Sequence, residues 1–273
     1  MPEYLRLVRG GRPPSEELIA EMRHNYEAIG GRSPLTELTL AQADALRARL
    51  GPDIPVGVGM RNWHPFIKDA LADLAGAGVD RVIGIPMAPQ FSTLSVQKYV
   101  DAATAALPNG IRFDAVHTFH THPLLLDALA ERLRAAAPKP DERVVFTAHS
   151  LPKRAIESGD PYADEVAATA RGVADRVGIT RYTIAYQSAG RTPEPWLGPS
   201  LEEMIDDQTG RGVRKFLVAP IGFVCDHTEI LYDIDVQAAQ TAREFSTSLR
   251  RTESLNTSPT FIAMLEDLVR ARL

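Results

Sequence analysis

The sequence predicts an α/β protein built from two doubly wound halves, each with a parallel sheet, that meet at a cleft. Six apolar runs of strand length alternate along the chain with segments of helical periodicity, and this alternation is typical of parallel sheets covered by helices. The 273 residues, 44% of them apolar, suffice for two modest domains, since single cores stop growing at about 250–300 residues.

The predicted strands are the apolar runs themselves, bounded by polar or Gly- and Pro-containing segments. They cover residues 54–59, 81–85, 113–118, 144–147, 182–186 and 216–220. Residues 4–29, by contrast, predict helices before any strand has occurred. That order is unusual, because a doubly wound domain normally begins with a strand.

The predicted helices between the strands carry apolar stripes that face a sheet. Leu125, Leu129 and Leu133 recur on one helical face, behind Pro123 at a position in the first turn where proline is tolerated. Ser258, followed by a proline, opens a final helix, which we expect to pack back across the two halves.

The best boundary between the halves is the Ala- and Pro-rich stretch at residues 135–141, with three predicted strands on each side. We therefore assign residues 1–138 to an N-terminal half and residues 139–273 to a C-terminal half. No internal repeat marks the halves, so this division depends on the pattern of strands and helices alone.

Composition argues against several classes of protein. The formal charge of −5 at pH 7 argues against nucleic-acid binding, which needs a concentrated basic face. Cys225 is the only cysteine, so the chain cannot form an internal disulfide, a multi-cysteine zinc site or an all-cysteine iron–sulfur cluster. No apolar run approaches the roughly 20 residues of a transmembrane span, and the first residues do not form a secretory leader, so we expect a cytoplasmic protein.

Polar side chains gather directly after the predicted strands, where parallel sheets bind ligands. His149 closely follows the buried run 144–147 and precedes Ser150-Leu151-Pro152, a turn that stops the strand. A single histidine in such a place often caps a helix or satisfies loop backbone. The gathering of several histidines at these ends favours a site, with His149 held rigidly at the cleft.

A second group of reactive side chains lies in the acidic segment after the last predicted strand. On a helix, Asp226, Glu229 and Asp233 occupy positions i, i+3 and i+7 and share one face. The helix dipole accounts for acids in the first turn but not for Asp233, nearly two turns in. With His149, these carboxylates offer N and O ligands suited to a borderline metal such as Fe²⁺, although spacing alone names no metal.

Other catalytic patterns are weak in this sequence. Residues 30–34 follow a predicted helix and lack the lysine of a phosphate-binding P-loop, so we interpret them as a shaped loop. Ser150 lacks the G-x-S-x-G elbow of a serine hydrolase.

Several long motifs follow one another nearly end to end along the chain. They are Tyr-Glu-Ala-Ile-Gly-Gly-Arg-Ser-Pro-Leu at 26–35, Gly-Met-Arg-Asn-Trp-His-Pro-Phe at 59–66, Ala-His-Ser-Leu-Pro at 148–152, Gly-Asp-Pro-Tyr at 159–162, Tyr-Gln-Ser at 186–188, Pro-Trp-Leu-Gly-Pro at 195–199, Pro-Ile-Gly-Phe-Val at 220–224 and Asp-His-Thr-Glu-Ile-Leu-Tyr-Asp at 226–233. In this order they resemble the ferrochelatases, the enzymes that insert ferrous iron into a porphyrin.

The resemblance implies two flavodoxin-like halves with the porphyrin in the cleft between them, which agrees with the halves inferred above. It implies that His149 and Glu229 form the catalytic pair that binds Fe²⁺ at the inner site. It assigns Asp226, His227 and Asp233 to an acidic helix for metal delivery and proton movement. In relatives this helix contains a π-type turn, a feature often found at functional sites.

Five further residues match porphyrin-binding positions of this family: Arg9, Tyr26, Ser33, Arg61 and Trp196. A guanidinium such as that of Arg9 pairs with a propionate through two parallel hydrogen bonds. The alternatives are an ordinary exposed arginine for Arg9 and simple packing for Trp196.

As a ferrochelatase, the chain would take Fe²⁺ and a porphyrin as substrates in heme biosynthesis and release two protons per turnover. We expect coproporphyrin III as the porphyrin, as in compact bacterial relatives, with protoporphyrin IX as the close alternative. We expect no prosthetic group and no iron–sulfur cluster, since the Cys-rich extension of some relatives is absent and Cys225 is interpreted as a small buried residue. Two alternatives remain open: a non-catalytic tetrapyrrole-binding protein, and a cobalt or nickel chelatase acting on sirohydrochlorin.

Two departures from the family pattern bear on the structure. Relatives begin with an apolar strand and a Gly-Thr-Pro turn, and this chain starts after that segment, so we expect a central strand of about 10–15 residues with its turn to be missing. We therefore expect a gap in the first sheet and poor solubility. Gln90 and His120 stand where some relatives have His and Tyr, which leaves the contacts at these positions open.

Overall fold

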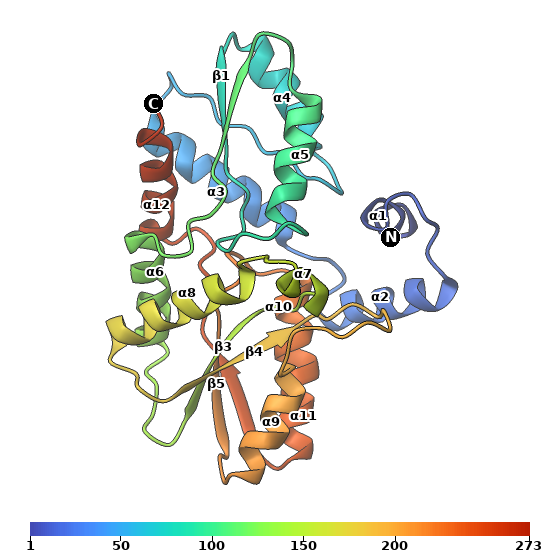
Figure 1. Ribbon diagram of the computed structural model, residues 1–273, viewed down its shortest axis with the longest axis vertical. Helices are drawn as coiled ribbons and strands as arrows, with labels where there is room; N and C mark the ends of the chain where they lie inside the picture. Colours follow the sequence, from blue (N-terminus) through green and yellow to red (C-terminus); the bar gives the residue numbers. More distant parts are fainter.

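Two separate parallel sheets organise the molecule and confirm the α/β class. The computed structural model describes residues 1–273. The smaller sheet, in the upper part of Figure 1, pairs β1 (Arg81–Gly84) with β2 (Arg112–Ala115). The larger sheet has the order β4-β3-β5-β6, and its strands are β3 (Arg143–His149), β4 (Tyr182–Gln187), β5 (Lys215–Pro220) and β6 (Ser248–Arg251).

The central position of β3 explains its continuous apolar run. It pairs with β4 on one side and with β5 on the other. Phe146 belongs to the core cluster on one face of the sheet, and Val145 belongs to the cluster on the opposite face. A strand covered on both faces needs apolar side chains throughout. The carboxyl end of this rigid strand carries His149.

Helices cover both faces of the larger sheet. On the face with Phe146, α6 starts at Pro123 as predicted and buries the Leu125, Leu129 and Leu133 stripe. These covering helices are α6 (Pro123–Ala135) and α8 (Tyr162–Val177) on one face, and α9 (Leu201–Gly210) and α11 (Ala239–Glu244) on the other, with the short α7 (Lys153–Glu157) above the sheet in Figure 1.

The last helix, α12 (Pro259–Arg270), packs against both α3 (Leu35–Leu50) and α6. It joins the upper and lower parts of the molecule along the left of Figure 1. Helix α6 also packs on α8, so α6 is part of the layer that covers the larger sheet. The boundary at residue 138 stays a prediction.

The smaller sheet lacks one predicted strand. Residues 54–59 form no strand, so this prediction is wrong, although β1 and β2 lie where the next two apolar runs predict them. A strand exists only with a neighbour to pair with, and the backbone of 54–59 has none. The helices of this part are α4 (Ile67–Gly76) and α5 (Val96–Ala106).

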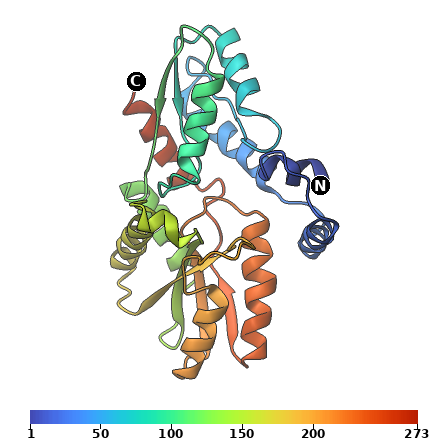
Figure 2. The same cartoon turned by 45° about the vertical axis from the view of Figure 1, so that its right-hand side comes forward.

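The chain begins with two helices, as predicted. They are α1 (Pro2–Val8) and α2 (Glu16–Ala28), and both lie beside the main body, away from the sheets (Figures 1 and 2). Ser15 caps α2 by accepting a hydrogen bond from the Leu18 amide at 3.2 Å. No helix of the molecule has the length and apolar character needed to cross a membrane.

The acidic segment differs in part from the continuous helix expected from sequence. It consists of α10 (Thr228–Leu231), the π-helix η1 (Asp233–Ala238) and then α11. The π-type turn expected from the resemblance is present. Because α10 begins only at Thr228, Asp226 lies outside the helix, and the prediction of one helical face for Asp226, Glu229 and Asp233 is wrong.

Candidate active site

His149 is fixed at the end of β3 by its neighbours. Its Nδ1 donates a hydrogen bond to the Ser150 carbonyl, which leaves Nε2 free to accept a proton or bind a metal. The Tyr162 hydroxyl donates to the His149 carbonyl at 3.0 Å, and the Ser150 amide donates to the Gln187 carbonyl at 2.7 Å. This rigid backbone aims one imidazole nitrogen away from the strand.

A close approach between β3 and the loop after β5 helps to define this strand end. Gly222, just after β5, packs so tightly against β3 that a Cβ there would lie 2.7 Å from the Ala148 Cβ. Only glycine fits this contact. The absence of a side chain at 222 thereby brings the start of the acidic segment close to His149.

Glu229 lies between two histidines. Its Oε2 is 3.7 Å from the His149 Nε2 and 3.6 Å from the His227 Nε2. The His227 Nδ1 lies 3.0 Å from the Cys225 carbonyl, so the proton on that nitrogen is held there and Nε2 faces the carboxylate. The predicted pair of His149 and Glu229 is therefore brought together, with His227 as a third member.

The charges of His149, Glu229 and His227 depend on one another. Burial by itself raises the pKa of Glu229, but His149 and His227 outweigh it and lower this pKa to about 2. Burial acts to lower the pKa of His227, and Glu229 outweighs it, so the pKa of this imidazole lies above its usual value. Glu229 is thus ionised at neutral pH, and an ionised carboxylate is suited to bind a cation.

Asp233 has the opposite electrostatics. Burial and the nearby charge of Glu229 raise its pKa to about 6, against the effect of a hydrogen bond from the Ser188 hydroxyl. A carboxyl with this pKa exchanges a proton near neutral pH. The π-helix begins at Asp233, while the Gln187 side-chain amide donates to the Glu229 carbonyl one turn earlier.

Asp226 belongs to a different network. It lies 3.1 Å from the Arg251 guanidinium and accepts hydrogen bonds from Ser254 at 2.7 Å and from Asn256 at 2.9 Å. Arg251 also pairs with Asp235 at 2.7 Å. The structure thus separates Asp226 from Glu229 and Asp233, with its oxygens engaged by neighbours in the fold.

Tyr4 is close enough to Glu229 for the carboxylate charge to act on its hydroxyl. Burial, Tyr26 and Glu229 raise the pKa of Tyr4, on α1, to about 12. Its ring makes an edge contact with Trp63 at 6.0 Å between centroids. No family motif includes Tyr4, so only the three-dimensional arrangement reveals it.

The residues predicted to contact the porphyrin lie in different environments. The Arg61 guanidinium lies 5.5 Å from the centre of the Tyr99 ring, near Tyr4. Arg9 is exposed at the end of α1, and the Ser33 hydroxyl accepts a hydrogen bond from the Leu35 amide at 3.4 Å. These positions leave the Arg9 guanidinium free for an anionic group.

Trp196 lies in the loop of residues 188–196, which we call the β4–α9 loop. Its indole N–H donates to the Thr192 hydroxyl at 3.1 Å, and its ring covers Gly190 so closely that a Cβ there would be 2.5 Å away. These contacts give Trp196 a packing role within the loop. Arg191 of the same loop forms an ion pair with Glu21 of α2.

Gln90 and His120 join the two halves. The Gln90 amide donates to the Thr169 hydroxyl at 3.0 Å and to the Ile221 carbonyl at 3.2 Å. His120 lies 3.1 Å from Glu165 of α8. Both residues therefore contact the helix that covers the larger sheet.

Cys225 is poorly suited to bind a metal. Burial raises the pKa of Cys225 to about 12, so its thiol stays protonated and is a poor ligand. No group of three or more His, Cys, Asp or Glu side chains could hold a metal ion.

Known sequences resemble this chain over its whole length. A model of the family described as Ferrochelatase matches residues 11–273. A ferrochelatase of Deinococcus radiodurans is 43% identical over 286 residues, covering 100% of this chain and 90% of that protein. One of Thermus thermophilus is 42% identical, covering 98% of this chain and 93% of that protein. A coproporphyrin III ferrochelatase of a Geobacillus species is 35% identical, covering 99% and 92%.

Solved structures share the fold at low identity. SirB from Bacillus subtilis with Fe³⁺ has a TM-score of 0.62 at 14% identity and covers 86% of this chain and 88% of that chain. CbiX, described as the terminal enzyme for biosynthesis of siroheme in denitrifying bacteria, has a TM-score of 0.59 at 17% identity and covers 88% and 94%. At these identities the likeness concerns the fold alone.

Proposed function

The chain belongs to the ferrochelatase family, as a lyase that inserts Fe²⁺ into a porphyrin in heme biosynthesis, and from this premise we propose that its porphyrin is coproporphyrin III. The observation that carries the proposal is the end-to-end match to relatives named coproporphyrin III ferrochelatases. Two Geobacillus proteins of that name are 35% and 36% identical and cover 99% and 98% of this chain.

The chemistry of the cleft supports this substrate. Coproporphyrin III carries four propionates, whereas protoporphyrin IX carries two, so a cleft for the former has more anionic groups to pair. Arg9 is exposed at the end of α1, and Arg61 is held over the Tyr99 ring. Each guanidinium can bind a carboxylate through two parallel hydrogen bonds.

We assign proton removal to His149. Metallation requires that the two pyrrole N–H protons leave while Fe²⁺ enters. A fixed imidazole with a free Nε2 is suited to accept a proton from a pyrrole N–H. The same nitrogen can instead hold the metal when it is not protonated.

We assign metal binding and proton exit to the carboxylates. Glu229 is ionised and lies 3.7 Å from His149, so it can bind Fe²⁺ beside the imidazole. Asp233, with its pKa raised to about 6, can accept a proton and release it to water at neutral pH. His227, whose Nε2 lies 3.6 Å from the Glu229 Oε2, can pass a proton on from Glu229.

We further propose that the reaction needs no prosthetic group and proceeds in the cytoplasm. The support is the lone cysteine, which is buried and protonated and therefore unsuited to hold an iron–sulfur cluster. A chain with one buried thiol also fits a reducing compartment.

The test is anaerobic incubation of the protein with Fe²⁺ and each porphyrin, followed by the absorbance change on metal insertion. We expect kcat/KM for coproporphyrin III to exceed that for protoporphyrin IX by at least about tenfold, which corresponds to about 1.4 kcal/mol of transition-state binding. Equal values, or a preference for protoporphyrin IX, would overturn the choice of substrate. Binding of both without metallation would identify a non-catalytic protein.

A further inference from the structure

Arg251 joins the two ends of the chain segment that carries the carboxylates of the site. Its guanidinium lies 3.1 Å from the Asp226 carboxylate and donates a hydrogen bond to the Asp235 carboxylate at 2.7 Å. Glu229 and Asp233 lie between these two aspartates in the sequence. A guanidinium is planar and has several N–H donors in a fixed arrangement, so it can bind two carboxylates at the same time.

Arg251 is anchored in the larger sheet. It is the last residue of β6 and lies opposite Val218 of β5 in the register of the sheet. The Thr252 amide donates to the Val218 carbonyl at 2.9 Å, and the Arg251 guanidinium donates to the Thr252 carbonyl at 3.0 Å. The Arg251 side chain is only 15% exposed, so water and salt screen its ion pairs less than those of the outer surface.

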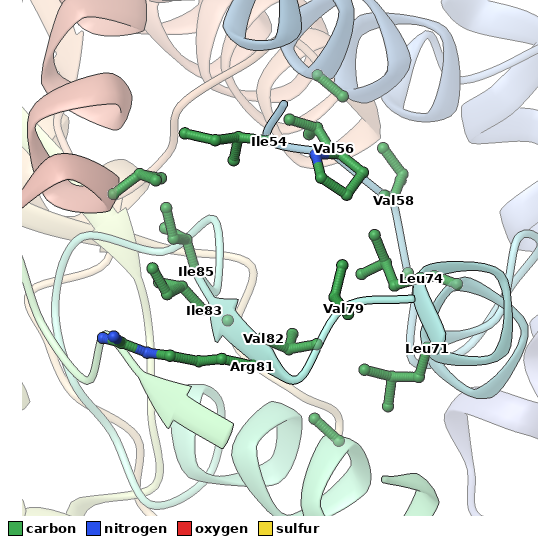
Figure 3. A pocket seen from close by; sticks show the side chains of 18 of the residues that line it. Ile54, Val56, Val58, Leu71, Leu74, Val79, Arg81, Val82, Ile83 and Ile85 are labelled. Carbon is green, nitrogen blue, oxygen red and sulfur yellow. The ribbon is translucent and has the colours of Figure 1, made fainter. Parts of the chain in front are cut away.

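The loop around Asp226 is also fixed to the upper part of the molecule. The Asn256 side chain accepts from the Asp226 amide and donates to the Asp226 carboxylate, both at 2.9 Å. Gln42 of α3 in turn donates to the Asn256 carbonyl at 2.9 Å and to the Val224 carbonyl at 3.2 Å. Gln42 lines an apolar cavity of about 740 Å³, whose mostly aliphatic walls are shown in Figure 3. A buried amide in such a wall needs polar partners, and the loop before α10 supplies them.

The ion pair with Asp235 fixes the rotation of the first turn of η1. The first three residues of this π-helix contact different parts of the fold. Asp233 accepts a hydrogen bond from Ser188, just after β4, and Ile234 is buried in the core. Asp235 pairs with Arg251 of β6. A rotation of the turn that released Asp235 would therefore also displace the Asp233 carboxyl.

We propose that Arg251 is a positioning residue for metallation: by binding two aspartates of one segment, it keeps Glu229 and Asp233 in place beside His149. Arg251 takes no part in the chemistry and acts through the backbone of residues 226–235. The proposal gives Asp226 an anchoring role, in place of the metal-delivery role that the resemblance implies. It rests on the roles proposed above for Glu229 and Asp233.

The experiment compares variants that break these ion pairs with a matched control from the same strand. Arg251→Gln removes both pairs, and Asp235→Asn removes one of them. The control is Arg250→Gln, because Arg250 pairs with Glu142 at 2.7 Å and donates to the Ala136 carbonyl at 2.6 Å, outside residues 226–235. For each protein, kcat and KM are measured in the anaerobic metallation assay, and hydrogen exchange of the backbone amides is followed by mass spectrometry.

Arg251→Gln should lower kcat by at least about tenfold and change KM for the porphyrin by less than about twofold, because a small displacement of reacting groups is costly in rate. Asp235→Asn should lower kcat as well, by a smaller factor. The two substitutions change the local charge in opposite directions, so an effect of charge alone would move kcat in opposite directions. Opposite changes in kcat, or an equal loss in Arg250→Gln, would overturn the proposal.

The double variant tests whether both residues act through one contact. Arg251→Gln combined with Asp235→Asn should lose no more kcat than Arg251→Gln alone, since the contact is already broken. Losses that multiply would contradict a shared role.

Hydrogen exchange tests the anchoring independently of activity. Arg251→Gln should speed exchange in residues 226–235 by at least about tenfold while β3 and β5 exchange as before, and Arg250→Gln should not. Unchanged exchange in residues 226–235 would refute the anchoring. If the unmodified protein metallated no porphyrin, the proposed function would fail, and faster exchange in Arg251→Gln would still support the anchoring.

Discussion

At the residue scale, two carboxylates of one site differ in how the fold shifts their pKa. Neighbouring imidazoles lower the pKa of Glu229 to about 2, against the effect of burial, whereas burial and Glu229 raise the pKa of Asp233 to about 6. Glu229 is therefore ionised at any physiological pH, whereas the Asp233 carboxyl can exchange a proton near neutral pH. The roles proposed for them follow from this difference.

The first prediction concerns stability against pH. An acid with a lowered pKa stabilises the fold above its unfolded pKa, and for Glu229 this stability is lost as the pH falls from about 4.5 to about 2. An acid with a raised pKa has the opposite sign, so Asp233 destabilises the fold as the pH rises from about 3.8 to about 6. At pH 7, Glu229→Gln should thus lower the free energy of unfolding and Asp233→Asn should raise it.

Urea unfolding of both variants at pH 7 measures this difference. In Asp233→Asn the new amide keeps an oxygen that can accept the Ser188 hydrogen bond, so the substitution removes charge with little loss of packing. A decrease in stability for both variants would contradict the opposite shifts.

The second prediction concerns His149 as the base. His149→Ala should reduce kcat for metallation by at least about a hundredfold, in the range found for general bases, with little change in porphyrin binding. The matched control is His122→Asn, since His122 caps α6 and pairs with Asp267 away from the site, and asparagine can still accept from the Leu124 amide. Metallation by the His149→Ala protein at the unmodified rate would refute its role.

At the element scale, the third prediction concerns the contact that defines the end of β3. Gly222→Val places side-chain atoms where a Cβ alone would lie 2.7 Å from the Ala148 Cβ, so β3 or the following loop must shift. We expect a loss of about 1–3 kcal/mol in stability and a larger loss of kcat, because His149 adjoins Ala148. Thermal unfolding and the metallation assay measure the two effects.

Gly210→Ala is the control for this prediction. Gly210 ends α9, and nothing lies within 4 Å of a Cβ placed there. The change should leave activity unaltered and stability equal or slightly higher. Identical behaviour of the two glycine variants would show that the close approach at Gly222 does not matter.

The elements that could be predicted from sequence are those whose pattern is local. Helix α6 could be predicted because Leu125, Leu129 and Leu133 recur at helical spacing within the segment itself. Strand β3 could be predicted because its apolar run is long enough to recognise. β6 could not be predicted because its sequence, Ser-Leu-Arg-Arg, has no apolar run, although it pairs with β5 at the sheet edge. The segment 54–59 has the apolar pattern of a strand, but pairing depends on a neighbour and not on the segment itself.

The candidate site was partly predictable for a similar reason. His149 and Glu229 could be found because the motifs around them are specific, and the structure brings them within 3.7 Å. The separation of Asp226 was not predictable, since it depends on Arg251, which lies in β6, far along the chain. Tyr4 could not be found because a contact with Trp63 leaves no trace in sequence spacing.

At the scale of the whole molecule, polar contacts join the two halves behind the site. Asp160, just before α8, accepts hydrogen bonds from the Ser92 hydroxyl at 2.9 Å and from the Thr93 amide at 2.7 Å. The loop after β1 is thereby fixed to the larger sheet. Helix α12 adds an apolar contact between α3 and α6. Near α2, by contrast, the contact is the exposed ion pair of Arg191 and Glu21.

The fourth prediction concerns the ion pair near α2. Arg191 of the β4–α9 loop pairs with Glu21 of α2, and Figure 1 shows that loop running beside α2. An exposed ion pair contributes only about 0–1 kcal/mol to stability, but this one joins α2, which carries Tyr26, to the loop that carries Trp196, and both residues are predicted to contact the porphyrin. Arg191→Ala should therefore raise KM for the porphyrin several-fold, with kcat and the unfolding midpoint nearly unchanged.

The control for this prediction is Arg211→Ala. Arg211, at the C-cap of α9, pairs with Asp207 at 3.0 Å, so its removal breaks an exposed ion pair that joins two residues of the same helix end. Both variants should unfold like the unmodified protein, and only Arg191→Ala should change KM. Because the pair is exposed, the effect should also appear in the unmodified protein as a KM that rises with salt. An unchanged KM for Arg191→Ala would show that α2 and the β4–α9 loop hold the porphyrin independently of each other.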